Sequence, residues 1–419
     1  MKSLKSILLL IVLLVAVAAS WHIYQQEQKK IAFKEDLVEL SKIKYGLFNV
    51  DTWKEKLADI LSKKVREFSL EGGNRKQMHD KIANFLYSVI TTFEDRFHQE
   101  NKKKLLGFMS DGIANLTGIF KQVKEDVPVF ADQILDFLNE EQNRASIRDF
   151  LIQKLNDYAD QTFAETDYTA VTAILNTYQS KDKAEAVAML NTKLTSIEQA
   201  LSLFKTGLLS LALCYFIFLL FPVNLSRLEL MITLLFCFVF LLLGISLPMI
   251  EIDARISQMN FTLLGEQLRF ADEVLYYKSK SILQVVGMML SQGKVKVLFV
   301  GVLVFAFSVF FPMLKLVCSM LYLYLQKLRE SKVVCFIVFK TGKWSMADVF
   351  VVAIFMAYIG FEGILSEQLK HLEGMSKEVE LLTTNHSSLM YGFFVFTAFV
   401  LLSLMSASKI KVEGLMIND

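Results

Sequence analysis

The stretch that decides the fold lies near the C-terminus and reads Gly342-Lys-Trp-Ser-Met-Ala-Asp348-Val-Phe-Val-Val-Ala-Ile-Phe-Met-Ala-Tyr-Ile-Gly360. Its apolar part approaches the roughly 20 residues that a helix needs to cross a bilayer. Trp344 suits the membrane interface, and Lys343 suits the water beside it. We therefore predict a membrane-spanning helix over residues 344–364.

Asp348 is the one acidic residue in this apolar stretch. An ionised carboxylate at mid-span costs about 2.5–3.5 kcal/mol on insertion scales, so it needs a partner or a water-filled cavity. Alternatively, Asp348 needs no partner, because it lies near the N-terminus of its helix, where the helix dipole favours a negative charge.

A second apolar run, Val295 to Leu325, contains a lysine. At about 1.5 Å per residue the run is too long for one straight span. Pro312 predicts a kink or a break, because proline removes a helix hydrogen bond and clashes with the preceding turn. Lys315 lies about 16 Å from one end of the run, and Asp348 lies about 12 Å into its own helix. Since a lysine side chain can extend toward a partner, we predict that these two charges meet on adjacent helices.

The composition is that of a membrane protein. Of the 419 residues, 53% are hydrophobic, and the mean hydropathy is +0.41. The formal net charge of +2 gives no argument for nucleic-acid binding. The 4 cysteines lie in apolar stretches without any Cys-x-x-Cys spacing, so we predict neither a disulfide framework nor a metal site, and no cofactor.

Residues 1–20 carry Lys2 and Lys5 followed by an apolar run. This pattern is typical of a cleaved signal peptide or of a membrane anchor. Val17-Ala-Ala19 offers small residues for cleavage, whereas Trp21 at the exit suits an interfacial anchor. We favour the uncleaved anchor.

Residues 21–201 are polar and contain stripes of apolar residues at helical spacing. Asp182 and Glu185 have the spacing of a capping box. About 180 residues can bury a core of their own, so we predict an exported, all-helical domain. His79 and His98 are isolated in the sequence and do not indicate a metal site.

Residues 202–410 form a predicted transmembrane domain with apolar spans at 203–223, 228–250, 295–325, 344–364 and 389–408. Together with the N-terminal anchor these give about six spans in an all-α, polytopic helix bundle. Basic residues cluster at the N-terminus, at residues 326–343 and at the C-terminus, which places both termini in the cytoplasm. Residues 251–294 then lie outside; we expect a polar loop over 256–275 and an amphipathic surface helix over 282–290.

No motif of an enzyme is present. Thr341-Gly342-Lys343 lacks the upstream glycine of a phosphate-binding loop, and neither His-Glu-x-x-His nor Gly-x-Ser-x-Gly occurs. The sequence therefore predicts a protein that is not an enzyme.

Three stretches together resemble the paraquat-inducible protein A family: Ser246-Leu-Pro-Met-Ile-Glu-Ile, Phe307-Ser-Val-Phe-Phe-Pro312-Met-Leu-Lys315-Leu, and the residues that follow Gly342. The resemblance covers roughly residues 229–408. It implies an integral protein of the Gram-negative inner membrane with a periplasmic domain. It also implies a partner that carries a mammalian-cell-entry (MCE) domain, phospholipid or another lipid as cargo, and a polar network of Lys315, Ser345 and Asp348 inside the membrane.

The sequence departs from that family in three respects. It lacks the cytoplasmic Cys-x-x-Cys pairs, it carries one copy of the unit where many members carry two, and residues 21–200 match none of its elements. Two functions remain open: an inner-membrane component of intermembrane lipid transport, and a membrane-anchored scaffold or envelope-stress sensor. They differ in the expected role of Lys315 and Asp348, since a scaffold needs the pair only to hold its helices together.

Overall fold

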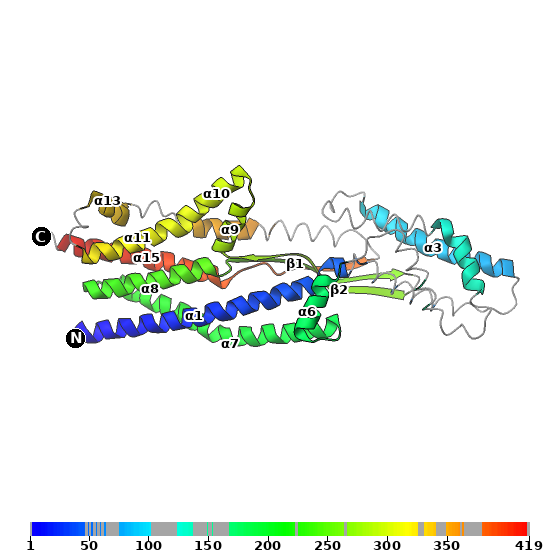
Figure 1. Cartoon of the computed structure of the whole chain (residues 1–419), viewed down its shortest axis with the longest axis horizontal. Helices are drawn as coiled ribbons and strands as arrows, with labels where there is room; N and C mark the ends of the chain where they lie inside the picture. Colours follow the sequence, from blue (N-terminus) through cyan, green and yellow to red (C-terminus); the bar gives the residue numbers. More distant parts are fainter. Residues whose placement is uncertain are drawn as a thin grey trace.

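The computed structural model describes residues 2–46, 75–101, 124–136, 167–222, 225–263, 266–325, 331–340, 349–360 and 379–416, together with positions 49, 52, 56, 59, 63, 149, 153 and 363. The molecule is elongated, with a helical bundle at one end and a stalk of helices and strands at the other (Figure 1). The helical elements of the bundle and stalk are α1 (Lys2–Leu40), η1 (Ile43–Tyr45), α6 (Thr169–Tyr178), α7 (Lys183–Leu220), α8 (Arg227–Ser246), α9 (Ile282–Ser291), α10 (Val295–Phe305), η3 (Ala306–Phe310), α11 (Phe311–Tyr324), α13 (Lys332–Cys335), η4 (Phe336–Lys340) and α15 (Tyr391–Met416). Helix α3 (Arg75–Asn101) lies at the far end of the stalk.

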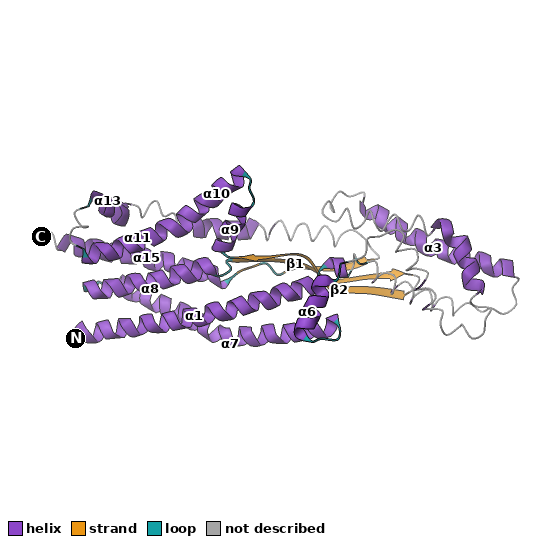
Figure 2. Cartoon of the chain, viewed as in Figure 1, coloured by secondary structure: helices purple, strands orange, loops and turns teal. Residues whose placement is uncertain are grey.

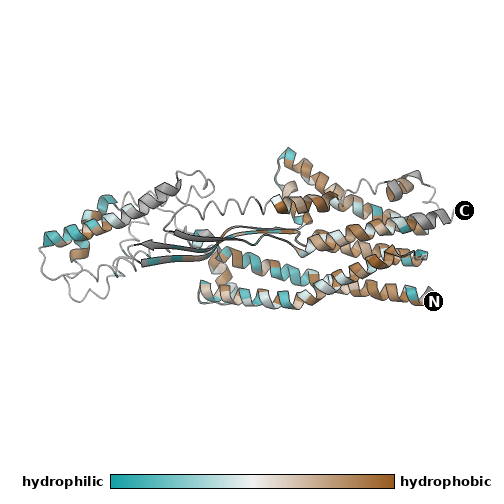
Figure 3. Cartoon of the chain, turned by 180° about the vertical axis from the view of Figure 1, so that it is seen from behind, coloured by the Kyte–Doolittle hydropathy of each residue, from teal (hydrophilic) through white to brown (hydrophobic). Residues whose placement is uncertain are grey.

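The predicted helical bundle is confirmed. Among the described residues, five helices are long and apolar enough to cross a membrane: Leu4–Leu40, Lys183–Leu220, Arg227–Ser246, Val295–Tyr324 and Tyr391–Ile410. The span predicted over 344–364 falls only partly on described residues, where Val349–Gly360 is an apolar helix. Apolar residues colour the bundle brown, whereas polar residues gather along the stalk (Figure 3).

The two termini lie at the same end of the bundle, and the strands lie beyond its other end (Figures 1 and 2). Contacts between chain segments agree with this arrangement. Lys5 near the N-terminus pairs with Glu229 at the start of α8, and Lys409 of α15 donates to the carbonyl of Phe221, which follows α7.

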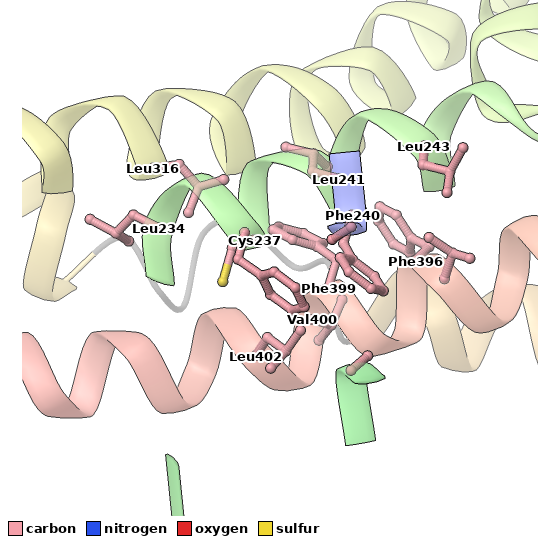
Figure 4. Close-up of a cluster of buried hydrophobic side chains, with 14 of the residues drawn as sticks. Leu234, Cys237, Phe240, Leu241, Leu243, Leu316, Phe396, Phe399, Val400 and Leu402 are labelled. Atoms are coloured by element: carbon pink, nitrogen blue, oxygen red, sulfur yellow. The ribbon is translucent and has the colours of Figure 1, made fainter. Parts of the chain in front are cut away.

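Helix α8 is the central helix of the bundle, and it packs against α15, α11 and α1. Its buried side chains interleave with those of α15. Phe236 and Phe240 of α8 and Phe396 and Phe399 of α15 are almost fully buried, and Figure 4 shows the last three together. The helices approach closely at Gly244, where a Cβ would lie 3.0 Å from the backbone of Phe396.

The segment predicted as an exterior polar loop is instead a β-sheet, so that prediction was wrong. Strands β1 (Ile250–Leu263) and β2 (Glu266–Lys280) form a long antiparallel hairpin. Strand β3 (Val379–Asn385) pairs with β1 on the other side, and the short β4 (Ser388–Leu389) pairs with the start of β1. At about 3.4 Å per residue, the 14 residues of β1 reach roughly 45 Å away from the bundle.

The strands could not be predicted from hydropathy, because some buried positions at the base of this sheet are acidic. Glu251 is buried and forms an ion pair with Lys34 of α1 while it accepts a hydrogen bond of 3.0 Å from the Tyr277 hydroxyl. Asp253 is buried against Arg255, which donates to both of its carboxylate oxygens at 2.8 and 2.9 Å. Burial and the Glu251 carboxylate raise the pKa of Tyr277, so its hydroxyl remains a donor.

The helical part of the stalk consists of α1 and α7, which pack against each other beyond the apolar bundle. Each is nearly 40 residues long, or about 58 Å, which is almost twice the thickness of bilayer hydrocarbon. Where they leave the apolar region, the buried Glu27 of α1 lies 2.6 Å from the ammonium of Lys205 on α7, and Lys205 also pairs with Glu198 at 3.1 Å. The residues predicted as an anchor and the start of the exported domain therefore share one continuous helix.

At the tip of the stalk, α3 contacts a second helix, residues 124–136. His79 of α3 faces two acceptors, with Nε2 3.1 Å from the Pro128 carbonyl and Nδ1 3.3 Å from the Asp80 carboxylate. The Asp132 carboxylate lies 3.9 Å from Nε2, and Arg75 pairs with Asp132 and Asp136 across the same interface. Both ring nitrogens can donate only when the imidazole is charged.

We expect the tip of the stalk to be more stable at low pH because of His79. The Asp80 carboxylate and then the Pro128 carbonyl raise the pKa of His79 above its ordinary value. Because the pKa of His79 is higher in the folded state, its protonation stabilises the fold. This contribution is fully present below the unfolded-state pKa of about 6.5 and is lost as the pH rises through the folded-state pKa. Thermal unfolding between pH 5 and 8 should show this dependence in the wild type and less of it in His79→Gln, with an amplitude below about 1 kcal/mol because the site is solvated. Equal pH dependence in both proteins would contradict this role.

Candidate functional site

Lys315 lies in the bundle core. It belongs to α11, which packs against α8, and only 6% of it is exposed. The residue that follows it, Leu316, joins the main apolar core (Figure 4). An ammonium group at this place is surrounded mainly by hydrocarbon side chains, so its charge is strongly influenced by the few polar groups nearby.

Polar groups from the two neighbouring helices lie near Lys315. Lys315 interacts electrostatically with the thiol of Cys237 on α8. The Cys237 Sγ lies 3.5 Å from the Ser406 Oγ of α15. Because Ser406 donates its own proton to the Leu402 carbonyl at 2.7 Å, the thiol is the donor in the Cys237–Ser406 contact. Three helices therefore contribute to one polar site in the core.

The same face of the η3–α11 helix carries further polar residues. Ser308, Lys315 and Ser319 are spaced by seven and four residues, which places them on one face of the helix, and all three are buried. We call these three residues the polar stripe. The Ser308 Oγ forms no hydrogen bond with any residue that the structure describes.

The helix is irregular at the start of the polar stripe. Residues Ala306–Phe310 form a π-helical turn, and Pro312 follows in the first turn of α11. Pro312 has no N–H, so it cannot donate to the carbonyl four residues earlier, that of Ser308. π-helical turns and proline are recognised causes of kinks, and π-turns are frequent at functional sites. The helix remains continuous through this region.

The other members of the predicted site, Ser345 and Asp348, lie outside the described residues, as does the predicted interfacial anchor Trp344. The described helix Val349–Gly360 begins directly after Asp348 in the sequence. Phe350 of this helix stacks edge-on against Phe396 of α15, with ring centroids 6.2 Å apart. The chain that follows Asp348 therefore packs on the helix that carries Ser406.

Trp21, the other predicted interfacial anchor, is 63% exposed on α1. It lies about 28 Å along the helix from Lys2, close to the roughly 30 Å thickness of bilayer hydrocarbon. This position is compatible with one membrane interface at Trp21 and the other at the N-terminus.

A second polar cluster, at the end of the bundle that holds the termini, was missed by the sequence analysis. The Glu229 carboxylate is buried, lies 3.4 Å from the Lys5 ammonium and accepts from the Ser6 hydroxyl at 3.3 Å. It also forms a reciprocal capping box with Ser226 at the start of α8. The spacing Ser226-x-x-Glu229 is the signal that could have revealed it.

The polar site in the bundle core combines a buried ammonium with a thiol and hydroxyl groups. The described residues contain no group of metal-ligating side chains. The polar stripe offers two hydroxyls and an ammonium group, and Cys237 of α8 adds a thiol beside Ser406. These groups can donate hydrogen bonds to one another or to water. A change in the charge of this site alters the electrostatic energy of helices α8, α11 and α15 together.

These features define the class of the molecule as a multi-pass helical membrane protein with a polar site in its core. Residues 275–370 match the family model of Paraquat-inducible protein A (PqiA), so the chain contains a PqiA-family domain. That domain includes the polar stripe, Pro312, and the positions of Ser345 and Asp348. No curated protein and no solved structure matches the chain.

Proposed function

We propose that this protein is an integral inner-membrane component of an intermembrane lipid transport system that acts with an MCE-domain partner. The observation that carries the proposal is the buried Lys315, which lies among polar groups of three helices in a PqiA domain. A charge retained at this depth costs free energy, so it is expected to have a functional role.

In this proposal Lys315 pairs with Asp348, and Ser345 belongs to the same network. Protonation of the carboxylate weakens the pair, so the balance between two arrangements of the bundle depends on protonation. The π-turn and Pro312 lie next to each other in the Val295–Tyr324 helix, and both favour bending of the helix at this point. The mechanism contains no enzymatic step, and its energy comes from protonation or from the partner.

The stalk is the part proposed to bind the partner. With both termini in the cytoplasm, α1 and α7 leave the membrane on the periplasmic side, together with the sheet. The part of α1 beyond Trp21 alone extends roughly 30 Å. This length allows contact with a periplasmic protein well away from the lipid headgroups.

The second candidate is a membrane-anchored scaffold or envelope-stress sensor without transport activity. It is favoured by the stalk residues before the PqiA domain, which that family model does not match. A scaffold should tolerate Lys315→Met combined with Asp348→Asn, because the double change removes both charges. A transporter should lose phospholipid homeostasis with the same change while it remains folded.

The proposed partner can be tested with a photoreactive amino acid at an exposed position of the stalk tip. Val129 is 56% exposed there, and Phe221, which is 60% exposed at the opposite end of the molecule, is the matched control. After irradiation of intact cells, mass spectrometry should identify an MCE-domain protein at Val129 and not at Phe221. If the positions around the stalk tip yield no such protein, the docking role is wrong.

A further inference from the structure

Helices α9 and α10 form a hairpin at the edge of the helical bundle (Figure 1). Helix α9 begins at a reciprocal capping box of Ser281 and Gln284 and buries Ile282 and Val286 in the bundle core. The two helices approach closely at Gly301, where a Cβ would lie 2.9 Å from the Cβ of Met289. The hairpin is therefore joined to the bundle through the buried residues of α9 and through α10, which continues into η3 and α11.

The outer faces of the hairpin are apolar and exposed. On α10, Val295 is 80% exposed and Phe299 64%. On α9, Met288 and Leu290 are exposed as well. In a chain that spans a membrane, such a surface is covered by acyl chains or by another apolar molecule.

Two lysines lie at the tip of the hairpin. Lys294 and Lys296 are exposed, and neither forms an ion pair or a side-chain hydrogen bond with any described residue. The polar colour of the tip contrasts with the apolar helices below it (Figure 3). The tip lies at the end of the bundle from which the sheet extends, because α9 directly follows β2.

The length of the helix places these lysines at the depth of lipid headgroups. Val295–Tyr324 contains 30 residues, or about 45 Å, which matches a bilayer with its headgroup layers rather than its 30 Å of hydrocarbon. One end of this helix therefore reaches each headgroup layer. Lys294 and Lys296 lie at the outward end.

The charge of this region selects the kind of molecule that covers it. No acidic residue occurs between Glu273 and Glu330, so the lysines cannot be neutralised by neighbours in the sequence. Cations close to a span are also disfavoured on the outward side of a bacterial inner membrane. A phosphate headgroup supplies the missing negative charge at the same depth, and its acyl chains fit the apolar faces.

We propose that the α9–α10 hairpin is a binding surface for an anionic phospholipid of the outward leaflet. Lys294 and Lys296 contact the headgroup phosphate, while the exposed faces of α9 and α10 contact the acyl chains. The hairpin holds this lipid beside the helix that carries the polar stripe. The inference takes the outward orientation of the hairpin from the proposed function, and it does not depend on whether the chain transports lipid.

The test is native mass spectrometry of the purified full-length protein titrated with phosphatidylglycerol or with phosphatidylcholine. We expect the wild type to bind phosphatidylglycerol more tightly. Each lysine near the headgroups contributes roughly a factor of five, so Lys294→Gln with Lys296→Gln should raise the apparent Kd for phosphatidylglycerol about 30-fold and leave that for phosphatidylcholine unchanged. The charge-preserving pair Lys294→Arg with Lys296→Arg should bind as the wild type does.

Lys181 and Lys183 provide the matched control, since they lie before and at the start of α7, at the end of that helix away from the bundle. Replacing both with glutamine changes the net charge equally and should not change lipid binding. An equal loss in this control, or an unchanged affinity in the Lys294/Lys296 variant, would overturn the proposal. Competition by glycerol phosphate as effective as that by the intact lipid would also overturn it, because it would show a site for a free anion. The single variants, each with a fivefold effect, provide the same test if the double variant does not fold.

Discussion

Replacing Lys315 with methionine is expected to abolish the function of the protein in envelope lipid homeostasis. Methionine has a similar length and fits a buried site, but it removes the charge of the buried ammonium. In the proposed mechanism no protonation-dependent change of the bundle is then possible. Cells that depend on the protein should become as sensitive to detergents and antibiotics as cells that lack it.

The loss must be separated from a failure to fold. Removal of one partner from a buried pair typically costs about 3–5 kcal/mol, so the amount of Lys315→Met in the membrane has to be measured beside its activity. Val317→Met is the matched control, because Val317 lies on the same helix and is 40% exposed on its outer face. The transport proposal is contradicted if Lys315→Met accumulates normally and retains wild-type lipid homeostasis.

Gly392→Ala is expected to destabilise the protein at the junction between the bundle and the sheet. A Cβ at Gly392 would lie 2.5 Å from the Pro248 carbonyl oxygen and 2.6 Å from that of Leu247. The Gly392 amide also donates to the Pro248 carbonyl at 3.0 Å. Both clashes involve backbone atoms where α8 ends and α15 begins, so no side-chain rotation can relieve them. We expect a loss of about 3 kcal/mol or more, at the upper end of overpacking.

Gly207→Ala is the control for that substitution. Gly207 lies within α7, and nothing lies within 4 Å of a Cβ at that position. Alanine there should leave the protein unchanged or stabilise it by about 0.5–1 kcal/mol, because alanine favours the helix over glycine. The comparison is made from thermal unfolding in detergent, with the yield of monodisperse protein as a second measure. Equal melting of the two variants would show that the contact at Gly392 is not tight.

The spans could be predicted because bilayer thickness imposes a length and a composition that sequence reveals directly. The predicted start at residue 295 and the apolar run ending near residue 325 agree with the helix Val295–Tyr324. The ends of the helices that leave the membrane were harder to predict. The span predicted to start at residue 203 is the second half of α7, whose polar first half continues as the stalk.

The sheet could not be predicted from hydropathy, because its buried positions carry charge. Glu251 and Asp253 are buried, yet their partners include Lys34, which is more than 200 residues away in the sequence. An alternation of apolar and polar residues identifies a strand only when its buried face is apolar. The ion pair between α1 and the sheet forms only in the tertiary structure, so no pattern in the neighbouring sequence predicts it.

Of the residues predicted for the intramembrane polar site, the structure describes Lys315 and Pro312, and the role of the site stays a prediction. The lysine near a proline in a long apolar run pointed to a buried charge, and Lys315 is buried. The contributions of Cys237 and Ser406 could not be predicted, because serine and cysteine occur often in spans and only helix packing brings these two together. The expected contact with Asp348 lies outside the described residues and stays a prediction.

The proposed mechanism requires that Lys315 and Asp348 interact inside the bundle, and a double-mutant cycle on stability measures this interaction. The free energy of unfolding is measured in the same detergent for the wild type, Lys315→Met, Asp348→Asn and the double variant. If the two side chains interact, the double variant should be less destabilised than the sum of the two single variants, with a coupling of about 1–3 kcal/mol, because each single change leaves one buried charge alone. Additive effects within about 0.5 kcal/mol would show that the two side chains do not interact, and would contradict the proposed mechanism.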